Sequence, residues 1–397
     1  MWGDHRDHHK RRTCLDAENC VLAHIGVRPP GVPVTPKWSV GNVRGHRASR
    51  ARWGRLRSWL MLVVVVGVVP MRGADGARTR PALRLDALQM VGTHNSYHLE
   101  PPPPLFDRRL AYGFPSLGDQ LSRWWMRQVE FDVWAGPDGT RWRPLGTRGF
   151  KVFHLEQVDM DSVCDTFVEC LRQLKRWSDG HPRHLPIAVL IEAKDDVVVP
   201  TPPRPVPITT PLLDELDREV RKVMKPRDLI TPDDVRRRHR TLEEAVLARR
   251  WPTVHAARGK FIFLLNGRHG TYLTGHPSLE GRVMFASSTP GQPDAAFVKI
   301  DDPTEANQAT IRRLVRRGYL VRTLADEPVL TPQSGDVSRR TLAFTSGAHW
   351  ISTNYPVPGL ADRWETSYVV AIPGGDIARC NPLVASPACT GRHFSSD

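Results

Sequence analysis

Two histidines, three carboxylates, one carboxamide and one lysine each stand at or near the end of an apolar stretch of this chain. They are His94, Asn95, Glu130, Asp132, His154, Glu192 and Lys194. Alternate residues of a strand share a face, so Glu130 and Asp132 must point the same way. Polar side chains that end otherwise apolar strands face a site rather than a core. We therefore predict that these seven residues form an active site.

The oxygen-bearing side chains of this set suggest a hard cation. Asn95, Glu130, Asp132 and Glu192 offer only oxygen ligands, which suit Ca²⁺ or Mg²⁺ better than zinc. Both histidines then remain for proton transfer. A cation flanked by two histidines can polarise a phosphodiester and lower the pKa of an attacking hydroxyl. Taken singly, each carboxylate could cap a helix and His154 could be a core residue, but that reading does not explain all seven positions.

The elements that must position these residues alternate between strands and helices. Apolar segments predict strands at 86–92, 128–133, 187–192, 260–265, 283–287, 296–300, 319–323 and 350–353. Helical patterns lie between many of them, at 162–177, 211–224, 241–249, 304–317 and 337–347. This order predicts an α/β fold, a parallel (β/α)₈ barrel of the TIM type. A doubly wound sheet is the competitor, but no glycine-rich phosphate turn follows the first strand.

Positive charge is concentrated near the N-terminus. The 397 residues have a formal net charge of +14, but residues 1–80 hold 15 Lys/Arg against 5 Asp/Glu. The remaining chain holds 41 against 37, so the basicity is not evidence that the main domain binds nucleic acid. We expect no nucleic-acid partner.

Three segments are predicted along the chain. Residues 1–57 form a basic extension without apolar periodicity, for which we expect disorder. Residues 58–77 contain a short apolar run behind an arginine-rich flank and end in small residues, a pattern typical of a signal peptide. A retained membrane anchor and a start codon downstream of Met1 both stay open. Residues 84–397 form the catalytic domain, and the signal predicts a secreted protein.

Four cysteines in the main domain fall into two close pairs. An exported chain favours the local disulfides Cys164–Cys170 and Cys380–Cys389 among the three possible connectivities. Cys164 and Cys170 cannot be joined inside one regular helix, because six helical residues separate their Cα atoms by about 9 Å. A helix that starts near Asp165 or Thr166 would remove this obstacle.

Several motifs resemble those of the calcium-dependent phosphatidylinositol-specific phospholipase C family, in particular its secreted bacterial branch. The motifs are VGTHNSY at 91–97, VEFDV at 129–133, VFH at 152–154 and IEAK at 191–194. The resemblance extends through segments 164–171, 297–303, 319–323 and 346–356 and so covers roughly residues 84–390. One departure is Asn354, which stands where the family commonly has an aspartate. Another is Trp125, which replaces a usual glycine before the second strand.

The resemblance implies a phosphodiesterase that cleaves phosphatidylinositol-type lipids to diacylglycerol and cyclic inositol phosphate at a membrane surface. His154 would protonate the leaving oxygen, and His94 would stabilise charge on the phosphate. The implied Ca²⁺ ligands are Asn95, Glu130, Asp132 and Glu192, and the implied substrate contacts are Lys194, Arg322 and Tyr355. We expect a monomer.

Two other functions are compatible with parts of the pattern. A glycerophosphodiester phosphodiesterase would use a similar barrel, but its usual His-Arg-Gly start is absent here. An inactive barrel that binds lipid head groups would not need the full set of seven residues. Both alternatives are weaker than the phospholipase hypothesis.

Overall fold

The computed structural model describes residues 82–103, 107–136, 149–197, 204–326, 330–387, 389–391 and 394. The predictions for 1–57 and 58–77 lie outside these residues. Eight strands of the described part run in parallel and form the framework. They are β1 (Leu88–Thr93), β2 (Gln128–Trp134), β4 (Ile187–Lys194), β6 (Phe261–Asn266), β7 (Met284–Ala286), β8 (Phe297–Lys299), β9 (Leu320–Leu324) and β10 (Trp350–Thr353). Each of the eight predicted strands is present.

Backbone hydrogen bonds join these strands into two sheets that contact each other at both edges. The ladders give the orders β1-β10-β9-β8 and β2-β4-β6-β7. Between β1 and β2, Arg127 N donates to Val91 O at 3.0 Å. Between β7 and β8, Ser287 and Phe297 form a parallel bridge, and Ser288 N donates to Phe297 O at 3.0 Å. The predicted (β/α)₈ barrel is thereby confirmed.

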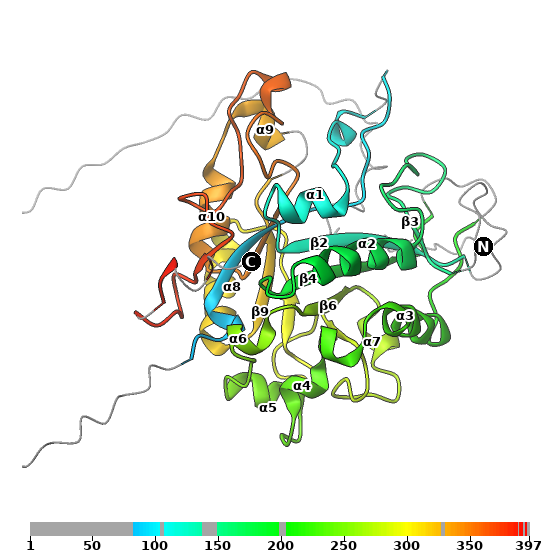
Figure 1. Ribbon diagram of the computed structural model, residues 1–397, viewed down its shortest axis with the longest axis vertical. Coiled ribbons are helices and arrows are strands. Elements are labelled where there is room, and N and C mark those ends of the chain that lie inside the picture. The colour runs from blue at the N-terminus through cyan, green and yellow to red at the C-terminus, as the bar shows by residue number, and fades with distance from the viewer. Residues whose placement is uncertain are drawn as a thin grey trace, which may run out of the picture. The chain divides into compact units, whose positions relative to one another are not determined.

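Helices lie outside the strands and cover the barrel (Figure 1). They are α1 (Leu117–Ser122), α2 (Phe167–Gly180), α3 (Thr210–Val223), α4 (Pro232–Arg236), α5 (Leu242–Leu247), α6 (Val254–Ala257), α7 (His269–Tyr272), α8 (Glu305–Arg317), α9 (Leu330–Ser334) and α10 (Ser338–Ser346). Thr166 caps α2 by accepting a hydrogen bond from Glu169 N, and Gly318 ends α8 in the left-handed region with φ 103°. No helix in the described part of the chain is both long and apolar enough to cross a membrane.

Three short strands stand apart from the parallel ring. β5 (Leu229–Ile230) adds to β6 in parallel, while β3 (Lys151–Val152) runs antiparallel to β2 and β11 (Ala378–Cys380) runs antiparallel to β1. The segment that leads to His154 is therefore not a parallel barrel strand. It runs antiparallel beside the last two residues of β2 instead.

A glycine allows the first two strands to approach closely. A Cβ atom at Gly92 would lie 2.3 Å from Gln128 Oε1 and 2.6 Å from Gln128 O. No side chain fits at this distance, so the glycine of the 91–97 motif is required by β1–β2 packing. The histidine that follows is thereby held near β2.

Both predicted disulfides are present. Cys164–Cys170 spans 5.2 Å between Cα atoms and Cys380–Cys389 spans 6.0 Å. Helix α2 begins at Phe167, so Cys164 lies in the preceding loop and the geometric obstacle is absent.

Candidate active site

A turn after β1 presents His94 and Asn95 and fastens them to β2. Ser96 N donates to Glu130 O at 3.0 Å, and Glu130 N donates to Ser96 Oγ at 2.8 Å. Asn95 occupies the left-handed region with φ 47°, a conformation that asparagine tolerates better than most residues. These bonds fix the first histidine and the amide beside the carboxylates of β2.

The three predicted carboxylates converge inside the barrel. Glu130 and Asp132 lie on one face of β2, and Asp132 is in register with Glu192 on β4. Their exposed fractions are 0%, 1% and 6%. Carboxylates so close and so deeply buried need positive partners or a cation, because an isolated buried charge is costly.

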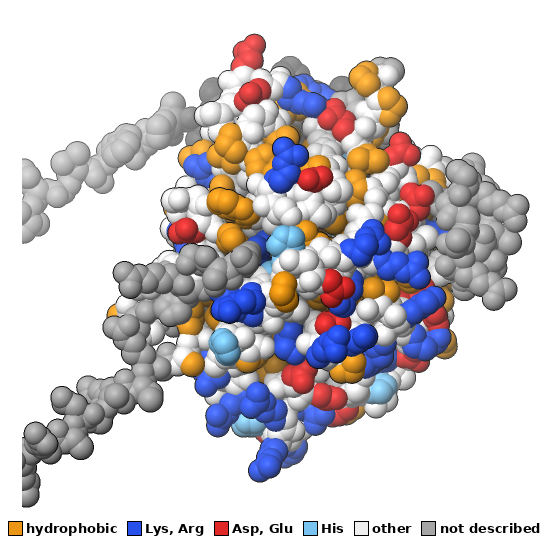
Figure 2. All heavy atoms as spheres, in the orientation of Figure 1, with side chains coloured by type: hydrophobic (Ala, Val, Ile, Leu, Met, Phe, Trp, Pro, Cys, Tyr) orange, Lys and Arg blue, Asp and Glu red, His pale blue; other side chains and the backbone are white. Residues whose placement is uncertain are grey.

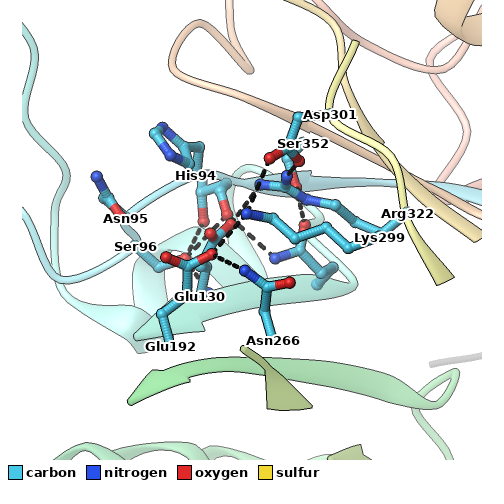
Figure 3. A network of polar contacts seen from close by, with 12 residues as sticks. His94, Asn95, Ser96, Glu130, Glu192, Asn266, Lys299, Asp301, Arg322 and Ser352 are labelled. Carbon is cyan, nitrogen blue, oxygen red and sulfur yellow. Dashed lines mark hydrogen bonds and ion pairs between the residues drawn. The ribbon is translucent and has the colours of Figure 1, made fainter. Parts of the chain in front are cut away.

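Cationic side chains of the barrel approach these carboxylates (Figure 3). Arg322 Nη2 lies 2.5 Å from Glu130 Oε2, and Lys299 Nζ lies 2.5 Å from Glu192 Oε1. Lys194 Nζ lies 3.1 Å from Glu192 Oε2 and 3.4 Å from Asp132 Oδ2. Burial raises the pKa of Glu130, while Arg322 acts in the opposite direction.

The donor set fits a hard cation. Glu130 Oε1 is buried and has no hydrogen-bond partner among the described residues, although Oε2 is paired. Asn95 Nδ2 donates to Tyr112 Oη at 3.1 Å, which turns its amide oxygen away from Tyr112. Burying a carboxylate oxygen without a hydrogen-bond partner costs free energy, unless the oxygen coordinates a bound ion. The residues at this position are thus suited to Ca²⁺.

His94 is oriented from β10. His94 N donates to Thr353 O at 3.1 Å, and the ring Nδ1 lies 3.3 Å from Asn354 Oδ1. Asn354 is itself held by its backbone, because Asn354 N donates to Asp326 Oδ1 at 3.3 Å. Burial raises the pKa of Asp326 to about 6, while bonds from Thr353 and Asn354 oppose that shift. Asn354, the departure noted in the sequence, therefore contacts the histidine directly.

His154 belongs to a cluster with Asp159 and His98. Asp159 Oδ2 lies 2.9 Å from His154 Nδ1 and 2.8 Å from His98 Nε2. Burial alone would raise the pKa of Asp159, but the hydrogen bonds from His154 and His98 outweigh it and lower the pKa to about 2. The side-chain atoms through which these three residues could bind a metal ion lie within 4.8 Å of one another. The ring of His98 stacks on Tyr112 at 4.3 Å, which links this cluster to Asn95.

The predicted substrate contacts are more enclosed than the sequence suggested. Arg322 is fully buried and also pairs with Asp301 and Ser352, so it forms part of the barrel interior. Tyr355 is buried, with its hydroxyl 3.3 Å from Trp364 Nε1 and its ring packed edge-on against Tyr368 at 6.0 Å. Lys194 remains partly exposed beside Glu192 and Asp132.

Sequence reasoning assigned no role to several residues of the site. Asn266 Nδ2 donates to Glu192 Oε1 at 2.8 Å from the end of β6, and Lys299 reaches the same carboxylate from the end of β8. Both end apolar strands, so the rule that identified Glu192 could also have identified them. His98 and Asp159 lie in loops, where no strand pattern marks them.

Comparison with known proteins identifies the family. A scan against family models matches residues 83–145 and 143–382 to "Phosphoinositide phospholipase C, Ca2+-dependent". The comparison with curated proteins found no match. Among solved structures, a Ca²⁺-dependent phosphatidylinositol-specific phospholipase C from Streptomyces antibioticus is 20% identical with a TM-score of 0.51, covering 72% of this chain and 98% of that chain. A calcium-dependent phosphoinositol-specific phospholipase C from Pseudomonas sp. is 18% identical with a TM-score of 0.49, covering 75% and 96%.

The chain belongs to the Ca²⁺-dependent phosphoinositide phospholipase C family, since the family model spans most of it. It is a phosphodiesterase of the phospholipase C type, and its cofactor is calcium. The likeness to the Streptomyces structure supports the barrel fold. The glycerophosphodiesterase and inactive-barrel hypotheses are not supported by this match.

Proposed function

We propose that the enzyme cleaves the glycerol–phosphate bond of phosphatidylinositol-type lipids and releases diacylglycerol and a cyclic inositol phosphate. The observation that carries this proposal is that the turn bearing His94 and Asn95 is fastened to β2, at the end of the barrel where three carboxylates are buried. Asn95, Glu130, Asp132 and Glu192 would hold Ca²⁺. Bound calcium would balance phosphate charge and lower the pKa of the attacking hydroxyl.

The substrate supplies its own nucleophile. The inositol 2-hydroxyl oxygen forms a bond to phosphorus, and its proton passes to a carboxylate of the site. The bond between phosphorus and the glycerol oxygen breaks, and His154 donates a proton to that oxygen. His94, held by Asn354, stabilises the charge that develops on the phosphate. Slower hydrolysis can open the cyclic product.

The proposal also includes the location of the substrate and the oligomeric state of the enzyme. The substrate is a phosphoinositide in a membrane surface, and the enzyme acts as a monomer. Basic and acidic side chains are interspersed on the face seen in Figure 2.

Assays of two variants on two substrates test the different catalytic roles proposed for the two histidines. The rate of lipid turnover by His154→Ala should fall roughly 10²–10⁴-fold, because the alkoxide leaving group of the lipid needs a proton. The rate of the same variant should fall much less on a 4-nitrophenyl inositol phosphate, whose leaving group is a stable anion. The rates of His94→Ala should fall by similar factors on both substrates, because charge develops on the phosphate with either leaving group. Equal losses for His154→Ala on the two substrates would refute its role as the acid.

A further inference from the structure

A tight turn brings a carboxylate back to His154. Leu155 N donates to Asp159 O at 2.9 Å, and Asp159 N donates to Leu155 O at 2.9 Å. Gln157, in the middle of this turn, has φ 65°, which reverses the chain direction. Asp159 therefore lies beside the histidine that precedes the turn.

The chain after Asp159 is fastened to the turn that follows β1. His98 and Ser162 form an antiparallel bridge, and Val163 N donates to Tyr97 O at 2.8 Å. The Cys164–Cys170 disulfide follows directly and ties this segment to α2. Asp159 is consequently held on both sides by backbone contacts, as a group that positions another side chain must be.

One carboxylate oxygen accepts hydrogen bonds from both histidines. Asp159 Oδ2 lies 2.8 Å from His98 Nε2 and 2.9 Å from His154 Nδ1, and its side chain is 1% exposed. The two imidazoles outweigh burial and lower the pKa of Asp159 to about 2, so it is ionised and can only accept. Both ring nitrogens therefore carry hydrogen.

The two ring nitrogens of His98 differ in their surroundings. His98 is fully buried, and its Nδ1 has no hydrogen-bond partner among the described residues. A proton there would be a buried donor without an acceptor, which is unfavourable. His98 therefore serves Asp159 as a donor through Nε2. The side chain of His154 is 17% exposed, so it is the ring of this pair that can exchange a proton.

We propose that Asp159 is a positioning residue for His154 and that His98 holds Asp159 in place. Asp159 keeps a proton on His154 Nδ1 and stabilises the imidazolium, so that Nε2 is the nitrogen that delivers the proton to the leaving oxygen. His98 contributes a fixed hydrogen-bond donor that holds the Asp159 carboxylate in one orientation. This inference rests on the proposed role of His154 as the acid.

Asp159→Asn in the full-length protein tests the proposal with little change in volume. With calcium in excess, turnover of the lipid should fall by roughly a hundredfold, because the amide no longer selects the tautomer or stabilises the imidazolium. Turnover of the 4-nitrophenyl substrate should fall by less than about tenfold. Asp161→Asn is the matched control, since Asp161 lies two residues further on and is exposed, and it should keep both rates.

The ratio of the lipid rate to the 4-nitrophenyl rate distinguishes a positioning role of Asp159 from a purely structural role. Loss of folding lowers both rates by the same factor, whereas loss of positioning lowers the lipid rate more than the 4-nitrophenyl rate. If His154→Ala changes the ratio and Asp159→Asn does not, the inference fails while the proposed function stands. If His154→Ala leaves the ratio unchanged, His154 is not the acid and the inference fails with that assignment.

His98→Phe isolates the second part of the proposal. Phenylalanine keeps a ring to stack on Tyr112 but has no N–H for Asp159. The ratio should move in the same direction as in Asp159→Asn but by a smaller factor, and an unchanged ratio would exclude His98. A zinc-selective chelator added with calcium in excess should change neither rate. Activity lost to that chelator and restored by zinc would assign the cluster to a transition metal and overturn the positioning role.

Discussion

At the scale of single residues, the barrel interior is built from charges that satisfy one another. Arg322 and Glu130 are both fully buried, and Arg322 also contacts Asp301 and Ser352. Removing one partner of such a pair leaves an uncompensated buried charge and costs about 3–5 kcal/mol. Arg322 therefore orients Glu130 through one carboxylate oxygen, and the other oxygen is the one proposed as the calcium ligand.

A buried histidine outside the site makes stability depend on pH. His349 Nδ1 accepts from Val321 N at 3.1 Å, and Nε2 lies 3.1 Å from Asp86 O. Burial lowers the pKa of His349 to about 4, against about 6.5 for an unperturbed histidine. Below pH 6.5 the unfolded chain binds a proton that the folded chain does not. The free energy of unfolding should thus fall as pH decreases from 6.5 to 4, by about 3 kcal/mol from this group.

Urea unfolding of the wild type and His349→Gln at several pH values measures this contribution. Burial also raises the pKa of Asp326 to about 6 and of Glu219 to about 7, so these acids stabilise the folded state as pH falls. Both proteins share that opposite contribution, so the difference between their slopes reports His349 alone. Parallel pH profiles would show that His349 does not titrate as inferred.

At the scale of elements, the disulfide Cys164–Cys170 joins the loop that follows Asp159 to helix α2. It closes a short loop next to the segment that carries Asp159. Replacing both cysteines by serine should lower the free energy of unfolding by roughly 2 kcal/mol. Lipid turnover should also fall, because Asp159 loses an anchor. Thermal unfolding and lipid assays of the double variant measure both effects, and unchanged values would show that the bridge does not support the loop.

The strands were predictable and the loops were not. Apolar runs such as 187–192 are long enough to specify buried parallel strands, and polar residues at their ends locate Glu130, Asp132 and Glu192. His98 and Asp159 meet through two separate turns, and the left-handed conformation at Gln157 has no sequence signal. The antiparallel course of β3 was likewise hidden, because two residues give no readable direction.

At the scale of the whole molecule, we propose that the enzyme is exported. Residues 58–77 combine a short apolar run with a preceding basic flank, and both predicted disulfides form. The mature protein should begin between about Asp75 and Arg80. N-terminal sequencing of protein collected from outside the cytoplasm checks this. A product that retains 58–69 and sediments with membranes would favour an anchor instead.

The most direct test of the account is phosphatidylinositol turnover by the purified enzyme at controlled free Ca²⁺, with the products identified. Chelation should abolish turnover, Ca²⁺ should restore it, and cyclic inositol phosphate should be the first water-soluble product. Glu130→Gln should raise the calcium concentration for half-maximal rate by at least roughly tenfold, about 1.4 kcal/mol of binding free energy. Glu169→Gln, an exposed position on α2, is the matched control and should leave that concentration unchanged. Full activity in excess chelator, or an unaltered calcium requirement in Glu130→Gln, would contradict the proposed metal site.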